Sequence, residues 1–452
     1  MTKILATIGP QTNNYNSISF INEYTQFMRL NGSHADHKWH QNAVTKIRDV
    51  NSEIIILLDI PGIKPRTCNL DCVDIDEGEE VTFYFGEEST DGDIPITSQL
   101  PALQEMPPSF SLNDGQHIFM TISYKKDSIR GLSNSSFRLN TRKGLNIPGG
   151  VYDDNKQQDL ILNFLDEFKD IDVDAYGISF VQNASIVNVV KERFPNKIIV
   201  SKLENIEGLR HLEEICKASD VIMIDRGDLA AEIGFENLYN GVTKISSCCK
   251  KNGKPLIMAT ENLSTMISIS QPSKSDIMSL GHSINIGADC IMLSEETAMA
   301  KEYRNIVRWL DSFLLKCNRD ITSGNRSTAW KGKGDLMWSV IENLPKNIPF
   351  IISSRSGKAM QKVLSYNFEH VHLITDNKRT FKLAHLYSQE IIVSFDPDIK
   401  IKVPSKLIYD YIKANMSAIF TDNSMALSTF VSEPFRGALA DNITFIDKNR
   451  LS

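Results

Sequence analysis

Residues 198–228 have the sequence IIVSKLENIEGLRHLEEICKASDVIMIDRGD, and the fold follows from the pattern in this stretch. Two short apolar runs, 198–200 and 221–224, have the length and composition of buried parallel strands. Between them, residues 207–217 place apolar side chains at helical spacing, so the stretch predicts one strand–helix–strand unit. Charged residues follow both runs, and parallel strands would bring these residues to the same edge of a sheet.

The same alternation recurs between residues 4 and 293. Short apolar runs end in polar or glycine residues, and helix-length segments lie between most of them. Eight alternations of strand and helix predict an α/β fold, the (β/α)8 TIM barrel. The eight runs are residues 4–8, 27–30, 54–58, 175–178, 198–200, 221–224, 256–258 and 290–293.

The alternation is interrupted once, after the third run. Residues 61–146 hold strand-like stretches with clustered Pro and Gly, which predicts a small β-barrel domain inserted as a lid in a βα loop. The catalytic barrel would then consist of residues 1–60 and 147–320.

A second domain is expected after the barrel. A Ser-, Gly- and Lys-rich linker leads into a further α/β section, so residues 321–452 are predicted to form a C-terminal α/β domain. Its strands are expected at residues 350–353, 371–375, 391–395 and 418–421.

Composition excludes several classes of protein. The chain has 452 residues, 41% apolar and 23% charged, as expected of a globular protein with more than one domain. Its net charge of -7 offers no basic field to nucleic acid or to an acidic membrane. Because no long apolar span and no signal-peptide core occur, we expect no membrane partner and a cytoplasmic location. The seven scattered cysteines suit free thiols in a reducing compartment.

Polar residues follow seven of the eight runs, and the ends of barrel strands converge on one mouth. One polar residue after a strand is usually part of a solvated loop, but seven on one face favour a functional site. Arg29, Arg66 and Lys202 could hold an anion, while Glu204 and Asp228 supply the two carboxylates usual for Mg²⁺. The expected ligands are therefore a small anion and a hard divalent cation.

The motifs at these positions resemble those of the pyruvate kinase family, in the same order. The resemblance covers residues 1–315, and the family carries a lid domain after its third strand. The motifs are Thr7-Ile-Gly-Pro10, Arg29-Leu-Asn-x-Ser33-His34, Asp59-x-x-Gly62-x-Lys64-x-Arg66-Thr67, Lys143-Gly-Leu-Asn-Ile-Pro-Gly149, Ile178-Ser-Phe-Val181, Ser201-Lys-Leu-Glu-Asn205, Arg226-Gly-Asp-Leu229, Ala259-Thr260 and Ala288-Asp-Cys-Ile-Met-Leu-Ser-x-Glu296-Thr297.

The resemblance implies phosphoryl transfer from phosphoenolpyruvate to ADP, giving pyruvate and ATP, with Mg²⁺ or Mn²⁺ as cofactor. By family pattern the divalent ion would be held by Glu204 and Asp228, and the protein would be a homo-oligomer. The implied catalytic residues are Arg29, Lys202, Thr260 and Ser294, and the implied substrate-binding residues are Arg29, Ser179, Phe180, Lys202, Gly227, Asp228 and Thr260. The nucleotide phosphates would meet Asn31, His34, Arg66 and Lys143.

A K⁺ site accompanies this family pattern. It corresponds to Asn31, Ser33, Asp59 and the carbonyl of Ile60. Lys64 stands where K⁺-dependent members usually carry glutamate, and an ammonium group could replace the ion because two neighbouring cations repel. K⁺ is therefore not expected to be required, unless the Lys64 side chain points to solvent.

Some residues depart from the family pattern. Asp225, Glu261 and Glu295 add carboxylates near a predicted anion site, which is unfavourable unless they are paired. The C-terminal domain also lacks the family's closing glycine-rich loop and is degenerate by that standard. Three alternatives therefore stay open: a pyruvate kinase, a diverged paralogue that uses phosphoenolpyruvate or a related keto-acid precursor for other chemistry, and a non-catalytic regulatory protein.

Overall fold

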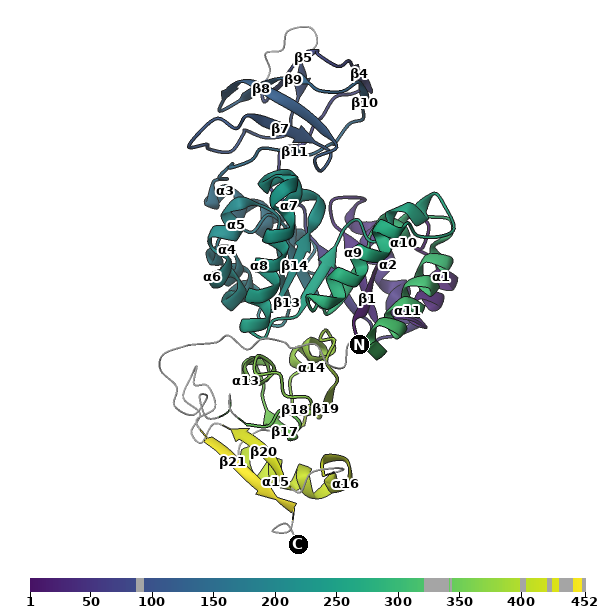
Figure 1. Ribbon diagram of the computed structural model, residues 1–452, viewed down its shortest axis with the longest axis vertical. Coiled ribbons are helices and arrows are strands. Elements are labelled where there is room, and N and C mark those ends of the chain that lie inside the picture. The colour runs from purple at the N-terminus through teal and green to yellow at the C-terminus, as the bar shows by residue number, and fades with distance from the viewer. Residues whose placement is uncertain are drawn as a thin grey trace.

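The computed structural model describes residues 1–86, 93–320, 341, 344–398, 404–420, 425–430 and 442–448. Three parts follow one another along its longest axis (Figure 1). A β domain lies at one end, the α/β barrel lies in the middle, and the C-terminal domain lies at the other end. This arrangement confirms the predicted fold class.

Eight parallel strands form a closed barrel, in the order β1-β16-β15-β14-β13-β12-β3-β2. Each predicted apolar run lies in or overlaps one of these strands. β13 is longer than its run, so Lys202 belongs to the strand and does not follow it. The strands are β1 (Lys3–Thr7), β2 (Phe27–Asn31), β3 (Ile55–Asp59), β12 (Ala175–Ile178), β13 (Ile198–Leu203), β14 (Val221–Asp225), β15 (Leu256–Ala259) and β16 (Cys290–Leu293).

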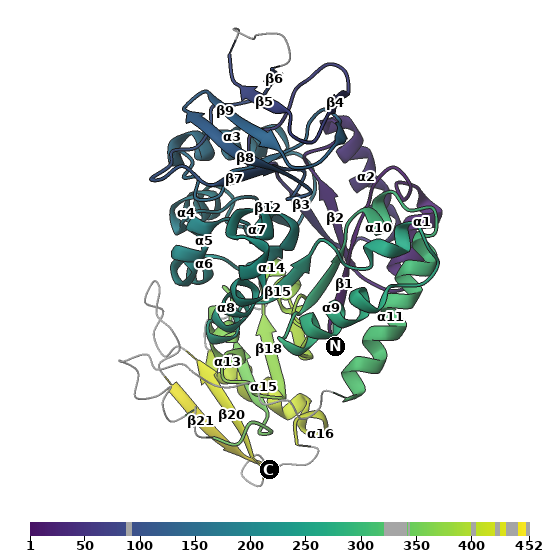
Figure 2. The same ribbon diagram turned by 45° about the horizontal axis from the view of Figure 1, so that its top comes forward.

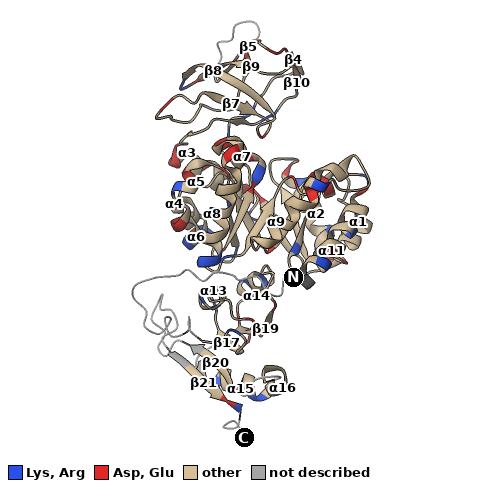
Figure 3. Cartoon of the chain, in the orientation of Figure 1, with Lys and Arg blue, Asp and Glu red and all other residues tan. Residues whose placement is uncertain are grey.

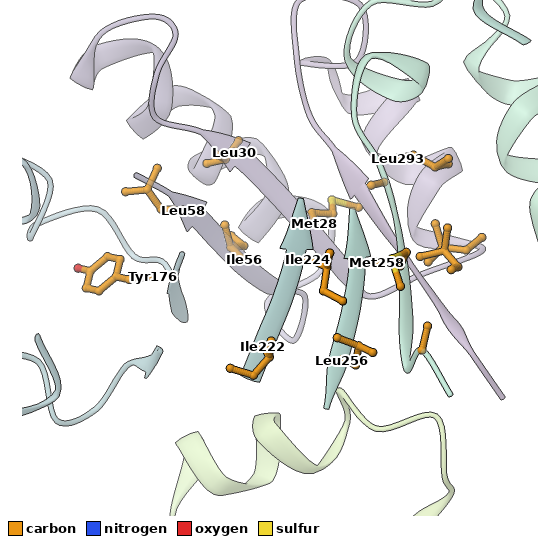
Figure 4. Close-up of a cluster of buried hydrophobic side chains, with 14 of the residues drawn as sticks. Met28, Leu30, Ile56, Leu58, Tyr176, Ile222, Ile224, Leu256, Met258 and Leu293 are labelled. Atoms are coloured by element: carbon orange, nitrogen blue, oxygen red, sulfur yellow. The ribbon is translucent and has the colours of Figure 1, made fainter. Parts of the chain in front are cut away.

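The strands are mostly apolar because both of their faces are buried, and most of their charged residues lie toward the C-terminal ends. In β3, Ile56 and Leu58 point outward into the core between strands and helices, where Figure 4 also shows Tyr176. Leu57, between them, belongs to the core that fills the barrel and includes Met223 of β14. The alternation of side chains along a strand therefore supplies two cores at once.

Helices surround the barrel, and several of them begin at capping side chains. Asn205, directly after Glu204, accepts a hydrogen bond from the Gly208 amide at 2.7 Å and so caps the next helix. Only two residues therefore separate the end of β13 from this helix. None of the described helices is long and apolar enough to cross a membrane. The barrel helices are α1 (Tyr15–Asn22), α2 (His37–Val50), α3 (Asp154–Glu167), α4 (Ala184–Arg193), α5 (Ile206–Arg210), α6 (Leu212–Ala218), α7 (Arg226–Ile233), α8 (Leu238–Lys251), α9 (Lys274–Asn285), α10 (Glu295–Ala298) and α11 (Tyr303–Asp320).

The inserted domain lies over the end of the barrel at which β2, β3 and β12 finish (Figure 2). Its described residues form a six-stranded sheet, β11-β7-β8-β9-β5-β6, and a two-stranded sheet, β10-β4, around one core. The rings of Phe83, Phe110 and Phe119 meet in that core. The strands are β4 (Val73–Ile75), β5 (Glu80–Tyr84), β6 (Ile94–Pro95), β7 (Ser109–Leu112), β8 (His117–Lys125), β9 (Ser128–Ser133), β10 (Phe137–Leu139) and β11 (Leu145–Asn146).

The C-terminal domain is a five-stranded sheet in the order β19-β18-β17-β20-β21. Three strands lie where the sequence predicted them, but the strand expected at 418–421 is wrong, because residues 416–419 form helix α16. A short apolar run does not distinguish a strand from a buried helix. The elements are β17 (Phe350–Ser353), α13 (Lys358–Leu364), β18 (Val371–Thr375), α14 (Lys378–Ala384), β19 (Ile391–Phe395), α15 (Pro404–Ala414), α16 (Met416–Ile419), β20 (Met425–Phe430) and β21 (Asn442–Asp447).

The C-terminal domain packs against the end of the barrel where the strands begin. The Tyr387 hydroxyl donates to the Gly253 carbonyl at 2.7 Å, and the Ser388 hydroxyl donates to Asp289 at 2.7 Å. Apolar side chains of the domain continue the core inside the barrel. The opposite end of the barrel is thus left to the inserted domain.

Candidate active site

Lys202 lies at the centre of a cluster of carboxylates at the C-terminal mouth of the barrel. Its ammonium nitrogen is 2.8 Å from Glu204 Oε1, 3.4 Å from Asp59 Oδ2 and 3.6 Å from Asp225 Oδ2. Burial opposes the charged form of this side chain, but the three carboxylates outweigh it and raise the pKa of Lys202. The group is therefore a fixed positive charge in a largely dry site.

Arg29, on β2, holds the second buried positive charge. Its Nε and Nη2 atoms donate to Asp59 Oδ2 at 2.9 and 2.7 Å, and Nη1 donates to the Thr7 hydroxyl at 3.1 Å. Burial favours the neutral form of Asp59, but Lys202 and Arg29 together lower the pKa of this carboxyl. Arg29 on β2 and Lys202 on β13 thus place two cations around one carboxylate, that of Asp59 on β3.

Glu204 is oriented by the loop that follows β12. The Phe180 amide donates to Glu204 Oε2 at 2.6 Å, and Phe180 has a left-handed φ of 55°. Such a backbone conformation is unfavourable for a bulky residue, which is consistent with a functional constraint. Ser179, one residue earlier, accepts from the Lys202 ammonium at 3.2 Å. The predicted residues Ser179 and Phe180 therefore lie in direct contact with Lys202 and Glu204.

Glu204, Asp225 and Asp228 form a group that could hold a metal ion. Each offers a carboxylate oxygen, and these atoms lie within 4.8 Å of one another. Burial raises the pKa of Asp225, and the charge of Asp228 acts in the same direction. Clustered oxygen ligands with mutual repulsion suit a hard cation such as Mg²⁺ or Mn²⁺. Figure 3 shows acidic residues of α7 at the end of the barrel that faces the inserted domain.

Lys64 points into the cleft and not to solvent. Its side chain is 4% exposed, and its ammonium contacts Asp228, the Asp114 carboxylate at 3.1 Å and Asn146 Oδ1 at 3.1 Å. Burial favours the neutral carboxyl of Asp228, but Lys64 reverses this effect and lowers the pKa of Asp228 to about 2. Lys64 thus neutralises a predicted metal ligand, and it lies on the Asp228 side of the cleft.

Thr260 and Gly227 hydrogen-bond to each other beside Asp225. The Gly227 amide donates to the Thr260 hydroxyl at 3.1 Å, and that hydroxyl lies 2.9 Å from Asp225 Oδ1. Arg226 donates to the Thr260 carbonyl and to Asn262 and so holds the loop after β15 in place. Thr260 and Gly227, both predicted to bind substrate, are therefore engaged with each other, and the Thr260 hydroxyl also donates to a carboxylate of the chain itself.

Of the three added carboxylates, Asp225 alone is buried in the site. Glu261 and Glu295 are exposed on the loops after β15 and β16. The Ser294 amide donates to Glu296 Oε2 at 2.7 Å. Among the described residues, the buried hydroxyl of Ser294 has no hydrogen-bond partner.

The residues predicted to bind nucleotide lie around the rim and are less buried. His34 is exposed, and its pKa is lowered by partial burial and by the charges of Arg66 and Arg29. Lys143 lies on the inserted domain, where partial burial and the charge of Lys143 lower the pKa of His117. Asn31 ends β2 and accepts from the Ser33 amide at 3.1 Å. His34 and Arg66 are thus brought near Arg29, whereas no hydrogen bond or ion pair described here joins Lys143 to the Lys202 cluster.

Three of the four predicted K⁺ ligands already have partners within the protein. Asp59 binds Arg29 and Lys202, and the Ile60 carbonyl accepts from the Ser179 hydroxyl at 2.7 Å. Asn31 binds the Ser33 amide, as stated above. These contacts leave the oxygen atoms of Asp59 and Ile60 engaged by donors of the chain.

Four residues of the site were missed in the sequence. Thr7 and Asn146 lie within the quoted motifs, and Glu232 follows Asp228 by four residues on α7, which places both on one helix face. Asn146 donates to Asp228 at 3.0 Å and lies 3.4 Å from Glu232. Asp114 carries no signal in the sequence, because it reaches the cleft from a turn of the inserted domain.

Comparisons with known proteins identify relatives of this chain. The chain is 30% identical over 327 residues to the pyruvate kinase of Encephalitozoon cuniculi, a match that covers 71% of this chain and 76% of that protein. It is 27% identical over 403 residues to the pyruvate kinase of Thermotoga maritima, covering 85% and 86% of the two chains. It is 29% identical over 372 residues to pyruvate kinase 2 of Trypanosoma brucei brucei, covering 76% and 70%. The family model for the pyruvate kinase barrel domain matches residues 1–305, and the chain therefore belongs to the pyruvate kinase family.

Proposed function

We propose that this chain is a pyruvate kinase, which transfers the phosphoryl group of phosphoenolpyruvate to ADP and yields pyruvate and ATP. The observation that carries the proposal is the position of Lys202, buried among Asp59, Glu204 and Asp225 at the mouth of the barrel. Phosphoryl transfer needs positioning and charge neutralisation more than covalent chemistry by the protein. A fixed, buried cation supplies both.

Lys202 would neutralise the charge that develops on the enolate and on the transferring phosphoryl group. Arg29, also buried, would hold the phosphate from the β2 side, because its guanidinium points toward the same carboxylate as Lys202. Ser179 orients the Lys202 ammonium through their contact at 3.2 Å. Lys202 and Arg29 would thus present positive charge without reorganisation during the reaction.

Glu204 and Asp228, with Asp225 beside them, would hold the divalent cation. When bound, Mg²⁺ or Mn²⁺ supplies positive charge that offsets the phosphate and enolate oxygens. Lys64 contacts Asp228 in the same region, so its ammonium shares that carboxylate.

Thr260 and Ser294 are proposed to lie beside carbon 3 and along the proton path. The buried Ser294 hydroxyl has no partner among the described residues, so it is available to donate or accept. Asn31, His34, Arg66 and Lys143 are proposed to meet the nucleotide phosphates from the rim and from the inserted domain. A cytoplasmic location and a homo-oligomeric state are part of the same proposal.

A second candidate function is favoured by Asp225. Its carboxylate accepts from the Thr260 hydroxyl, which in turn accepts from the Gly227 amide. A substrate carboxylate bound at the Thr260 hydroxyl and the Gly227 amide would lie close to the negative charge of Asp225. Two like charges in close proximity repel strongly. A diverged paralogue that uses phosphoenolpyruvate or a related keto-acid precursor for other chemistry, with the substrate carboxylate placed away from Asp225, would avoid the repulsion.

The test is ATP formation from phosphoenolpyruvate, ADP and Mg²⁺, with a Lys202→Met variant as the matched control. Turnover in the unmodified protein and its loss in the variant would support a pyruvate kinase. Metal-dependent binding of phosphoenolpyruvate without ATP would favour the paralogue. If neither turnover nor binding occurred, the regulatory alternative would replace both.

A further inference from the structure

We propose a second anion-binding site, in a cavity between the barrel and the C-terminal domain. The cavity has a volume of about 260 Å³. It is lined by the segments that lead into β3, β12 and β13 and by the beginning of α14. It therefore lies at the opposite end of the barrel from the candidate active site, and its chemistry is independent of the proposed reaction.

The lining of the cavity carries an excess of positive charge. Five cationic side chains and two carboxylates line it, which leaves an excess of three positive charges. The barrel and the C-terminal domain both contribute cations, and Figure 3 shows those of α14. The cations are Arg48, Lys197, Lys378, Arg379 and Lys382, and the carboxylates are Asp172 and Asp174.

Two of the cations, Arg48 and Lys382, form ion pairs with the two carboxylates of the lining. Arg48 Nε lies 2.8 Å from Asp172 Oδ2, and its Nη2 lies 2.8 Å from Asp174 Oδ2. Lys382 reaches the other oxygen of Asp174 at 2.6 Å. These ion pairs fix the walls of the cavity and leave no acidic group of the lining for the other cations.

Lys197 and Lys378 form no ion pair with any described residue. The Lys197 ammonium donates to the Val173 carbonyl at 2.5 Å, and Lys378 is exposed at the rim. Burial lowers the pKa of Lys197; the charges of Asp174 and Asp172 oppose this effect, and those of Arg48 and Lys382 act with burial. An anion in the cavity would stabilise the charged ammonium of Lys197 against burial and against these two cations.

Arg379 fixes the geometry between the two lysines. Its Nε donates to the Lys197 carbonyl at 2.9 Å, and its guanidinium forms an ion pair with Asp220, which lies outside the lining. Asp220 also binds Lys191 at 2.8 Å, so this carboxylate is shared by Arg379 and one further cation. The excess of three positive charges is therefore unchanged when Asp220 and Lys191 are included.

The ligand class follows from the size and the charge. The cavity is slightly smaller than the roughly 300–1,000 Å³ typical of pockets for drug-sized molecules, so the ligand is small. Phosphate or carboxylate groups with two or more negative charges would match the surplus. Because cations of both domains would contact the anion, its binding would hold the C-terminal domain on the barrel and stabilise the folded protein.

The test uses inorganic pyrophosphate as the probe, without divalent metal and at ionic strength held constant with potassium chloride. The melting temperature of the full chain is expected to rise by roughly 2 °C or more at saturation. The rise should persist in Lys202→Met, which weakens anion binding at the active site. It should vanish in Lys378→Glu and in Lys197→Gln, and titration calorimetry should show at least a tenfold weaker affinity for both variants.

The matched control is Lys301→Glu, which makes the same charge change at an exposed lysine of the barrel away from the cavity. This variant should keep the full rise in melting temperature. The proposal is overturned if pyrophosphate gives no rise, or if the rise survives in both cavity variants. It is also overturned if only Lys202→Met loses the rise, because the anion would then bind at the active site.

Discussion

Lys64 and Asp228 form a buried ion pair that joins the loop after β3 to the first turn of α7. The pair places an ammonium on a carboxylate proposed to bind the divalent cation. Two unit charges about 4 Å apart interact by about 1 to 4 kcal/mol, depending on the effective dielectric constant. A metal ion must therefore share Asp228 with Lys64.

The first prediction follows from this pair. Lys64→Met should bind Mn²⁺ more tightly than the unmodified protein, with a dissociation constant lower by roughly tenfold, because Asp228 loses its competing cation. Electron paramagnetic resonance of free Mn²⁺ measures this without any turnover. Equal or weaker binding in the variant would mean that Lys64 supports the metal site and does not compete with the ion.

Lys202→Met is expected to reduce phosphoryl transfer by about two to three orders of magnitude, as the loss of a preorganised electrostatic group does. Asp59, Glu204 and Asp225 lose their common cation, but they can take up protons, so the variant should still fold. ATP formation and the circular dichroism spectrum are the two measurements. Near-normal turnover in a folded variant would contradict the proposed role.

Glu204→Gln and Asp228→Asn should each raise the Mg²⁺ concentration needed for half-maximal activity. Each variant removes one anionic ligand from a hard cation, and the effect should exceed roughly tenfold. Glu302→Gln, on the exposed surface, is the control with the same chemical change. Unchanged metal dependence in both site variants would remove Glu204 and Asp228 from the metal site.

His372 makes stability depend on pH in the C-terminal domain. Burial lowers the pKa of His372 from 6.5 to about 4, and its Nδ1 lies 3.1 Å from the Tyr411 hydroxyl. Between these pH values the unfolded chain binds more protons, so stability should fall as pH decreases from about 6.5 to about 4. Urea unfolding of His372→Gln should show a pH dependence smaller by about 1 to 3 kcal/mol over this window. An unchanged dependence would assign the effect to other groups.

The barrel and much of the candidate site were predictable because both depend on local patterns. Apolar runs predict strands, and the end of a barrel strand determines where its next side chains converge. Lys202, Glu204 and Arg29 were identified in this way, and the structure brings them together. The same rule predicted that the loop after β12 reaches the site, and in the structure the Phe180 amide of this loop donates to Glu204.

The contacts between domains were not predictable from such patterns. Asp114 and Asn146 come from the inserted domain and meet Lys64 only because of the way that domain lies on the barrel. No local periodicity encodes this orientation, which depends on packing between residues far apart in the chain. The strand expected at 418–421 failed for a different reason, since Ile419 and Phe420 are buried whether they belong to a helix or a strand.

The last prediction is that activity hardly depends on K⁺. The oxygen atoms of Asp59 and Ile60 already accept from Arg29, Lys202 and Ser179, so a monovalent ion would have to displace donors of the chain. Lys64 adds a buried ammonium to the same cleft, and a further cation close to it would be repelled.

The measurement is turnover in tetramethylammonium buffer free of Na⁺ and K⁺, before and after K⁺ is added. Lys64→Glu replaces the ammonium with a carboxylate, a change of two charge units, and should create a requirement for K⁺, because the cleft then lacks the positive charge of Lys64. Lys301→Glu makes the same substitution at an exposed site and should behave like the unmodified protein. Strong activation of the unmodified protein by K⁺ would show that the ion reaches Asp59 despite Arg29 and Lys202. In that case the ammonium of Lys64 would act only on the carboxylates that it contacts, Asp228 and Asp114.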